Sequence, residues 1–143
     1  MQTTTVHPDA YEVSPAERPR FLPRLFSTDY LRAEISAYVY AGKYLTDYSG
    51  GEWAFMRLAG TGGYMVPPAG TWRFENPDNG AVADVSADAA GIIITALVLN
   101  HRSHLYARHD QEALCAHFTL RWRQLMDFAE THPEATAIFR ALD

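Results

Sequence analysis

Apolar residues first recur at helical spacing just after residue 26. Ser27, Thr28 and Asp29 offer side-chain oxygens of the kind that commonly cap the start of a helix. The residues that follow form one apolar stripe, which comprises Leu31, Ile35, Tyr38, Val39 and Leu45. This pattern predicts a helix over residues 28–46, with the stripe on the side that faces the core.

The chain then changes to short segments separated by turn residues. Each segment is bounded by Gly or Pro and is rich in aromatic and β-branched residues, which favour strands. The connections, including the glycine-rich Gly60–Gly63, are short enough for hairpins. These features predict an antiparallel meander of four strands at Glu52–Leu58, Gly63–Pro67, Thr71–Glu75 and Ala81–Val85.

The most apolar stretch, Ala89–Leu99, is open to two interpretations. Ile92–Thr95 alone could form a buried strand, but Ser86 is a good N-cap and Asp88 complements the positive end of a helix dipole. Because the apolar run is also longer than a typical strand, we expect a nearly fully buried helix over 87–104. An amphipathic pattern predicts a further helix over about 110–131, and Pro133 followed by Glu134 starts a short last helix.

Together these elements predict an α+β fold. We expect a small antiparallel sheet of about four strands packed against about four helices, in the order α-ββββ-ααα. Residues 1–20 contain Pro8, Pro15 and Pro19 and show little periodicity, which predicts a flexible N-terminal segment. Residues 21–143 are expected to form a single domain.

Composition and charge narrow the functional classes. The chain has 143 residues, of which 48% are apolar, and this is enough for a folded core. Its 17 acidic and 12 basic residues give a net charge of −5, whereas nucleic-acid-binding domains are typically basic. A folded protein of this size is roughly 35–40 Å in diameter. Duplex DNA of that length would display roughly 20 negative charges, so 17 carboxylates offset by 12 cations do not imitate it. Since the sequence also shows no secretory signal and no run long enough to span a bilayer, we expect a cytoplasmic protein that binds neither nucleic acid stably nor a membrane.

No motif of a known catalytic or cofactor-binding class is present in the sequence. His101 and His104 share one face of the predicted helix and, with a carboxylate such as Asp110, could hold a metal ion; the alternative is that they are solvated residues at a helix end. Cys115 and His117 are two residues apart, so on a helix they point away from each other and cannot act as a nucleophile and its base. We therefore predict a non-catalytic protein with no cofactor and no metal site. A small metal-binding protein or enzyme that uses His101 and His104 is the alternative hypothesis.

Five blocks in the chain form a more specific pattern, and they cover about residues 20–143. They are Phe21-Leu-Pro-Arg-Leu-Phe26, Asp47-Tyr-Ser-Gly-Gly-Glu-Trp53, Gly62-Gly-Tyr-Met-Val-Pro67, Ser86-Ala-Asp-Ala-Ala-Gly-Ile92, and His132-Pro-Glu-Ala135 continued by Ile138-Phe-Arg-Ala-Leu-Asp143. In this order the blocks resemble the ArdB/KlcA antirestriction family. The resemblance implies an α+β protein that is carried by a plasmid or other mobile element. It also implies that the protein protects incoming DNA by inhibiting type I restriction enzymes in the cell, and that it is not a DNA mimic.

The resemblance further implies a protein partner, which is a type I restriction-modification complex or an associated host protein, contacted directly or indirectly. Aromatic residues beside flexible glycine turns are good interface anchors. We therefore predict contacts with the partner at Tyr48, Gly51, Trp53, Tyr64 and Asp88. The alternative is that Trp53 and Tyr64 point into the core and that Asp88 only stabilises the start of a helix.

Overall fold

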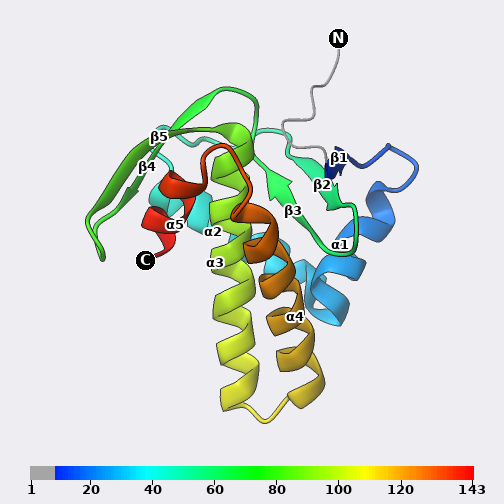
Figure 1. The fold of residues 1–143 in the computed structure, drawn as a ribbon. Coiled ribbons are helices and arrows are strands. Elements are labelled where there is room, and N and C mark those ends of the chain that lie inside the picture. The colour runs from blue at the N-terminus through cyan, green and yellow to red at the C-terminus, as the bar shows by residue number, and fades with distance from the viewer. Residues whose placement is uncertain (1–8) are drawn as a thin grey trace.

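The computed structural model describes residues 9–143 of the chain. Figure 1 shows these residues as two small antiparallel sheets and a set of helices, with one long helix, α3, between the sheets. The elements in chain order are β1 (Ala10–Glu12), α1 (Arg18–Phe26), the 3-10 turn η1 (Ser27–Asp29), α2 (Tyr30–Tyr44), β2 (Ala54–Leu58), β3 (Gly63–Val66), β4 (Thr71–Asn76), β5 (Ala81–Ser86), α3 (Ala87–Arg108), α4 (Glu112–Ala129) and α5 (Ala135–Leu142). The predicted α+β class is confirmed, and from α2 onward the elements follow the predicted order α-ββββ-ααα.

Helix α3 forms where the sequence predicts a buried helix rather than a strand. Ser86 is its N-cap, because the Ser86 hydroxyl accepts a hydrogen bond from the backbone N–H of Ala89 at 3.1 Å. The residues from Asp88 to Ala96 are all buried, so the first half of the helix is enclosed on every side. Helix α4 runs back along α3, and α2 and α5 also pack against it (Figure 1).

The predicted four-stranded meander is instead divided into two sheets. Strands β2 and β3 form one hairpin, with Met56 opposite Tyr64, and β4 and β5 form another, with Phe74 opposite Ala83. Strand β1 extends the first sheet, and β3 does not pair with β4. The reason is that α3 lies against the outer edge of β3 and occupies the place of a further strand.

The contact between α3 and β3 is unusually close. The Thr95 hydroxyl of α3 accepts a hydrogen bond from the backbone N–H of Met65 at 3.0 Å. In a continuous sheet, a carbonyl group of the neighbouring strand would accept this hydrogen bond. At Gly91 the helix backbone approaches the strand so closely that a Cβ atom would overlap the Met65 carbonyl oxygen and lie 2.9 Å from the Cα of Val66. A glycine is therefore required here for space, not for backbone flexibility.

The N-terminal region differs from the prediction of a flexible segment over residues 1–20. Residues Ala10–Glu12 pair with β2, and the N–H of Val13 continues this pairing by donating to the Phe55 carbonyl at 2.9 Å. Ala10 and Val13 are both buried, so this short strand adds to the core. Helix α1 also begins before residue 20, at Arg18. The part of the prediction that concerns residues 1–8 lies outside the described residues.

Helix α2 packs with the opposite face to the predicted one. Leu31, Ile35 and Val39 of the predicted core stripe are 61–63% exposed. The buried face instead carries the small residues Ala33, Ala37 and Ala41, followed by Tyr44. Small residues let α2 approach the core closely, and this packing requirement outweighs the greater hydrophobicity of Leu and Ile.

Replacing Gly91 with Ala tests the close contact between α3 and β3. We expect the free energy of unfolding to fall by about 2 kcal/mol or more, because the added Cβ has no space beside the β3 backbone. Gly42 of α2 is the matched control: a Cβ there meets no heavy atom within 4 Å, so Gly42→Ala should raise the free energy of unfolding by roughly 0.5–1 kcal/mol. Urea unfolding measures both changes. A Gly91→Ala variant as stable as the parent would contradict the contact.

Candidate functional site

The predicted contact residues fall into two separate groups in the structure. Tyr48, Gly51 and Trp53 lie in the loop before β2, beside the loop that joins β3 to β4. Tyr64 and Asp88 are hydrogen-bonded to each other inside the molecule, from β3 and the first turn of α3. Of the five residues, only Tyr48 and Gly51 of the first group are at the surface.

The first group is held together by aromatic contacts. The Tyr48 ring centroid is 6.0 Å from that of Trp53 and 6.0 Å from that of Trp72. The Trp53 indole N–H donates to the Tyr48 hydroxyl at 3.0 Å, and the Trp72 indole N–H donates to the Pro68 carbonyl at 2.9 Å. Each bond fixes one of the two loops internally, and the ring contact between Tyr48 and Trp72 joins the loops to each other.

We call the outer side of these two loops the loop surface, which comprises residues 48–52, residues 67–70 and Trp72. Trp53 lies beneath this surface and is only 3% exposed, whereas Tyr48 and Trp72 are half-buried. Gly51 has φ +117°, and a Cβ atom there would lie 2.6 Å from Cγ of Pro68. The glycine is thus needed both for its backbone conformation and for the fit between the loops.

The second group is part of a buried hydrogen-bond network. The Tyr64 hydroxyl donates to Oδ1 of Asp88 at 2.7 Å, and Nε2 of His132 lies 2.8 Å from Oδ2 of the same carboxylate. Nδ1 of His132 accepts from the backbone N–H of Glu134 at 2.9 Å, so the ring proton belongs on Nε2, which donates it to Asp88. Tyr64, Asp88 and His132 are at most 9% exposed.

The network continues from Glu134 to the start of α3. The Glu134 carboxylate accepts hydrogen bonds from both the backbone N–H and the hydroxyl of Ser86, the N-cap residue. The network therefore joins β3, the first turn of α3 and the segment between α4 and α5. Burial, followed by the negative charge of Asp88 and its hydrogen bond, raises the pKa of Tyr64, so this phenol stays protonated.

Sequence reasoning found Tyr64 and Asp88 but did not connect them with His132 and Glu134. Asp88 and His132 are 44 residues apart, and Ser86 and Glu134 are 48 residues apart, so no spacing pattern could reveal these pairs. The same applies to the buried ion pair of Arg102 with Asp29, which ties α3 to the turn before α2. The sequence offered only His132 and Glu134 just before the start of α5, and nothing near them in the chain indicates their partners.

The residues of the metal-site hypothesis lie elsewhere. His101 and His104 are largely exposed on α3; partial burial of the His101 ring, followed by the nearby charge of Arg102, lowers the pKa of His101. Across residues 9–143, no three His, Cys, Asp or Glu side chains are close enough to hold a metal ion together. Cys115 and His117 do not contact each other as a pair; Nε2 of His117 lies 2.9 Å from the Leu25 carbonyl oxygen instead.

The chain has clear relatives among known proteins. A family model described as "Antirestriction protein" matches residues 46–143. YubI of Escherichia coli K12 is 42% identical over 136 residues, which cover 95% of this chain and 96% of YubI. The antirestriction protein KlcA of Escherichia coli is 39% identical over 139 residues, which cover 94% of this chain and 92% of KlcA. None of the helices within residues 9–143 is sufficiently long and apolar to span a membrane.

The similarity extends to the three-dimensional structure. A solved structure matches with a TM-score of 0.84 and 36% identity, covering 99% of this chain and 100% of the other. It comes from work that describes, for the KlcA and ArdB proteins, a novel fold and antirestriction activity against type I DNA restriction systems in vivo but not in vitro. The resemblance carried by the five sequence blocks is thereby confirmed.

Replacing Asp88 with Asn tests whether the buried network stabilises the fold. If the new amide oxygen accepts from Nε2 of His132, the amide N–H₂ group faces the Tyr64 hydroxyl, whose own proton then loses its acceptor; in the other orientation the N–H₂ group faces the ring proton on Nε2. We expect the free energy of unfolding to fall by about 1–3 kcal/mol. Asp84→Asn is the control, because this carboxylate is 66% exposed and lies 3.8 Å from an exposed Arg73, so the change should stay within about 0.5 kcal/mol. Equal effects of the two substitutions in urea unfolding would contradict a stabilising role.

Proposed function

This chain belongs to the KlcA/ArdB family of antirestriction proteins, and we propose that it protects incoming DNA in the cytoplasm by inhibiting type I restriction enzymes. The observation that carries this proposal is the full-length match to a solved structure from work that describes type I antirestriction activity. Identity of 36% and coverage of 99% leave no large part of this chain without a counterpart in that structure.

We propose that the protein acts by binding another macromolecule. The work on KlcA and ArdB describes activity in vivo but not in vitro, which favours a target that includes something the cell supplies. The partner is thus a type I restriction-modification complex together with, or reached through, a host protein. A requirement for a component that the cell supplies favours binding to a partner over a reaction that the protein would catalyse alone.

The buried network supports a non-catalytic role. Tyr64, Asp88 and His132 are residue types that occur in catalytic sites, but both carboxylate oxygens of Asp88 and both ring nitrogens of His132 already have hydrogen-bond partners. All three residues are at most 9% exposed, so a substrate has little access to them. Their arrangement suits a network that positions β3 and α3.

The placement of carboxylates supports a mechanism other than DNA mimicry. Asp29 and Asp88 are buried, and Asp29 is neutralised by Arg102. At the surface, Glu75 forms an ion pair with Arg73 at 2.7 Å, and Glu34 accepts a hydrogen bond from the Tyr38 hydroxyl at 2.6 Å. These four carboxylates are buried or bound to a neighbouring side chain, so they do not contribute to a regular row of charges such as a DNA backbone displays.

The loop surface is the contact region that we propose for the partner. Tyr48 and Trp72 are partly exposed aromatic residues, which contribute strongly to protein interfaces. They are held in place before binding by Trp53 and Pro68, so little conformational freedom would be lost on docking. Of the five predicted contact residues, Tyr48 and Gly51 would touch the partner and Trp53 would support the loop surface from inside, whereas Tyr64 and Asp88 belong to the separate buried network.

Phage plating tests the proposed function. Expression of the protein in a host with an active type I restriction system should raise the plating of unmodified phage toward that on a host without the system. Plating on the non-restricting host should not change. Equal plating with and without soluble, folded protein in the restricting host would contradict the proposed function.

Substitution of Ala69 tests the loop surface separately. Ala69→Arg adds a long charged side chain at an exposed position without removing a contact, so it should abolish protection while changing the free energy of unfolding by less than about 0.5 kcal/mol. Ala107→Arg introduces the same side chain at an exposed position near the end of α3 and should leave protection intact. Full protection by Ala69→Arg would contradict this docking surface while leaving the proposed function standing.

A further inference from the structure

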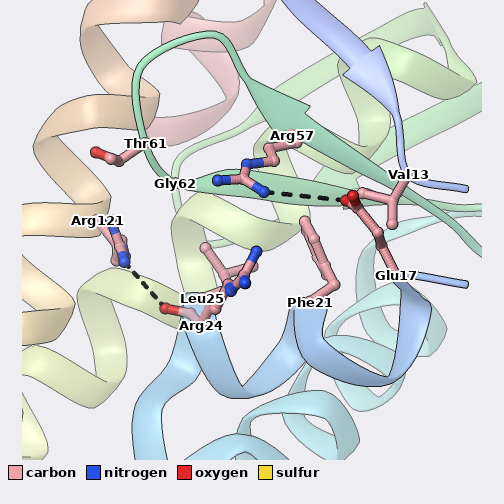
Figure 2. Close-up of a pocket in the computed structure, with 9 residues that line it drawn as sticks. All are labelled: Val13, Glu17, Phe21, Arg24, Leu25, Arg57, Thr61, Gly62 and Arg121. Carbon is pink, nitrogen blue, oxygen red and sulfur yellow. Dashed lines mark hydrogen bonds and ion pairs between the residues drawn. The ribbon is translucent and has the colours of Figure 1, made fainter.

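A small cavity lies between α1, the turn of the β2–β3 hairpin and α4 (Figure 2). Its apolar wall is formed by Val13, Phe21 and Leu25. The remaining residues around it are mainly polar or charged, and they come from three different elements of the fold. The cavity has a volume of about 60 Å³, several times the roughly 10–15 Å³ that a single water molecule needs.

Positive charge gathers around this cavity. Figure 2 shows the guanidinium groups of Arg24, Arg57 and Arg121 around it, from α1, β2 and α4 respectively. One carboxylate, that of Glu17, also lines the cavity; it is 4.0 Å from Arg57 and its side chain is 48% exposed. The lining residues therefore carry three positive charges and one negative charge, although the whole chain has a net charge of −5.

Arg121 is held in a fixed orientation by the protein. Its Nη1 donates to the Gln124 side chain at 3.1 Å and its Nη2 donates to the Arg24 carbonyl at 3.1 Å. Among the described residues, its Nε is the one buried side-chain polar atom without a hydrogen-bond partner. Burial and the neighbouring charge of Arg57 lower the pKa of Arg121, as expected for a desolvated guanidinium close to a second cation.

The rim of the cavity is also rigid. Gln124 of α4 donates a hydrogen bond to the Thr61 hydroxyl in the hairpin turn. The next residue, Gly62, has φ +87°, and a Cβ atom there would lie 2.8 Å from Oε1 of Gln124. The turn thus rests directly on α4, which keeps β2 and α4, the elements that carry Arg57 and Arg121, beside each other.

We propose that this cavity binds a single phosphate group. Guanidinium groups on different sides of a cavity can each donate to a different oxygen of a tetrahedral anion, whereas a carboxylate offers only two oxygens. The local excess of two positive charges balances a phosphate monoester, which carries close to two negative charges at neutral pH. The volume admits the phosphate but not a nucleobase or a sugar.

Two sources could supply the phosphate: a small molecule, which includes inorganic phosphate itself, or the terminal phosphate of a nucleic acid. The small cavity and the net charge of −5 favour a small molecule, because a longer nucleic-acid strand would be repelled outside the cavity. Inorganic phosphate and a 5′-phosphorylated tetranucleotide distinguish the two sources experimentally.

Titration of the isotope-labelled protein with inorganic phosphate, at constant ionic strength in chloride, tests the proposal by NMR. We expect saturable shifts of the Gly62 amide and of the arginine Nε–H signals. Arg57→Gln should weaken phosphate binding roughly tenfold, as expected for loss of a hydrogen bond to a charged group. Glu17→Gln should tighten binding by up to roughly fivefold, because it releases Arg57 from a competing exposed ion pair.

Arg123→Gln is the matched control, because Arg123 is exposed on the same helix as Arg121 and does not line the cavity. It should leave phosphate affinity unchanged. If the tetranucleotide binds more weakly than phosphate, the ligand is a small molecule. If the tetranucleotide binds more tightly than phosphate and Arg57→Gln abolishes this binding, the phosphate site is supported with a nucleic acid as the source. Non-saturable shifts, equal affinity for acetate, or an unchanged affinity of Arg57→Gln would overturn the proposal.

Discussion

The rest of the structure depends on the close contact between α3 and the edge of β3. Gly91 allows the helix backbone to touch the strand, and Thr95 accepts the hydrogen bond that the Met65 N–H would otherwise lack. A buried N–H without a partner is costly, so the threonine lets a helix lie where a fourth strand would be expected. This arrangement ends the first sheet at β3 and leaves β4 and β5 to form their own hairpin on the other side of α3.

A second set of interactions fixes the same helix at its first turn. Asp88 receives hydrogen bonds from Tyr64 and His132, and Ser86 is bound by Glu134. The side chain of Ser86 serves two purposes, because it caps α3 and also binds the segment that leads into α5. The first half of α3 is nearly uniformly apolar and has no amphipathic pattern to set its rotation, so these polar groups define its orientation and position.

Most elements could be predicted from the sequence because their signals are local. The hairpins follow from turn residues between β-rich segments, and Ser86 with Asp88 identified the start of α3. What the sequence could not reveal is how elements meet. Turn signals do not say which strand edges stay unpaired, and the greater hydrophobicity of Leu31 and Ile35 concealed that α2 packs through its alanines. For the same reason Tyr64 and Asp88 could be selected only as candidate contact residues, and their hydrogen-bond network with the distant His132 could not be foreseen.

The β2–β3 hairpin connects the two surfaces for which we propose binding. Trp53 and Pro68 flank its open end and support the loop surface, whereas Arg57 and the turn at Gly62 line the arginine-rich cavity. Helix α1 reaches both ends: Arg18 donates to the Trp53 carbonyl at 3.0 Å, and residues further along the helix line the cavity. Because β3 is fixed on α3, neither end of the hairpin can shift without disturbing the core. The protein therefore presents the two surfaces in a fixed relation, as suits a binding protein whose interfaces are formed before the partner arrives.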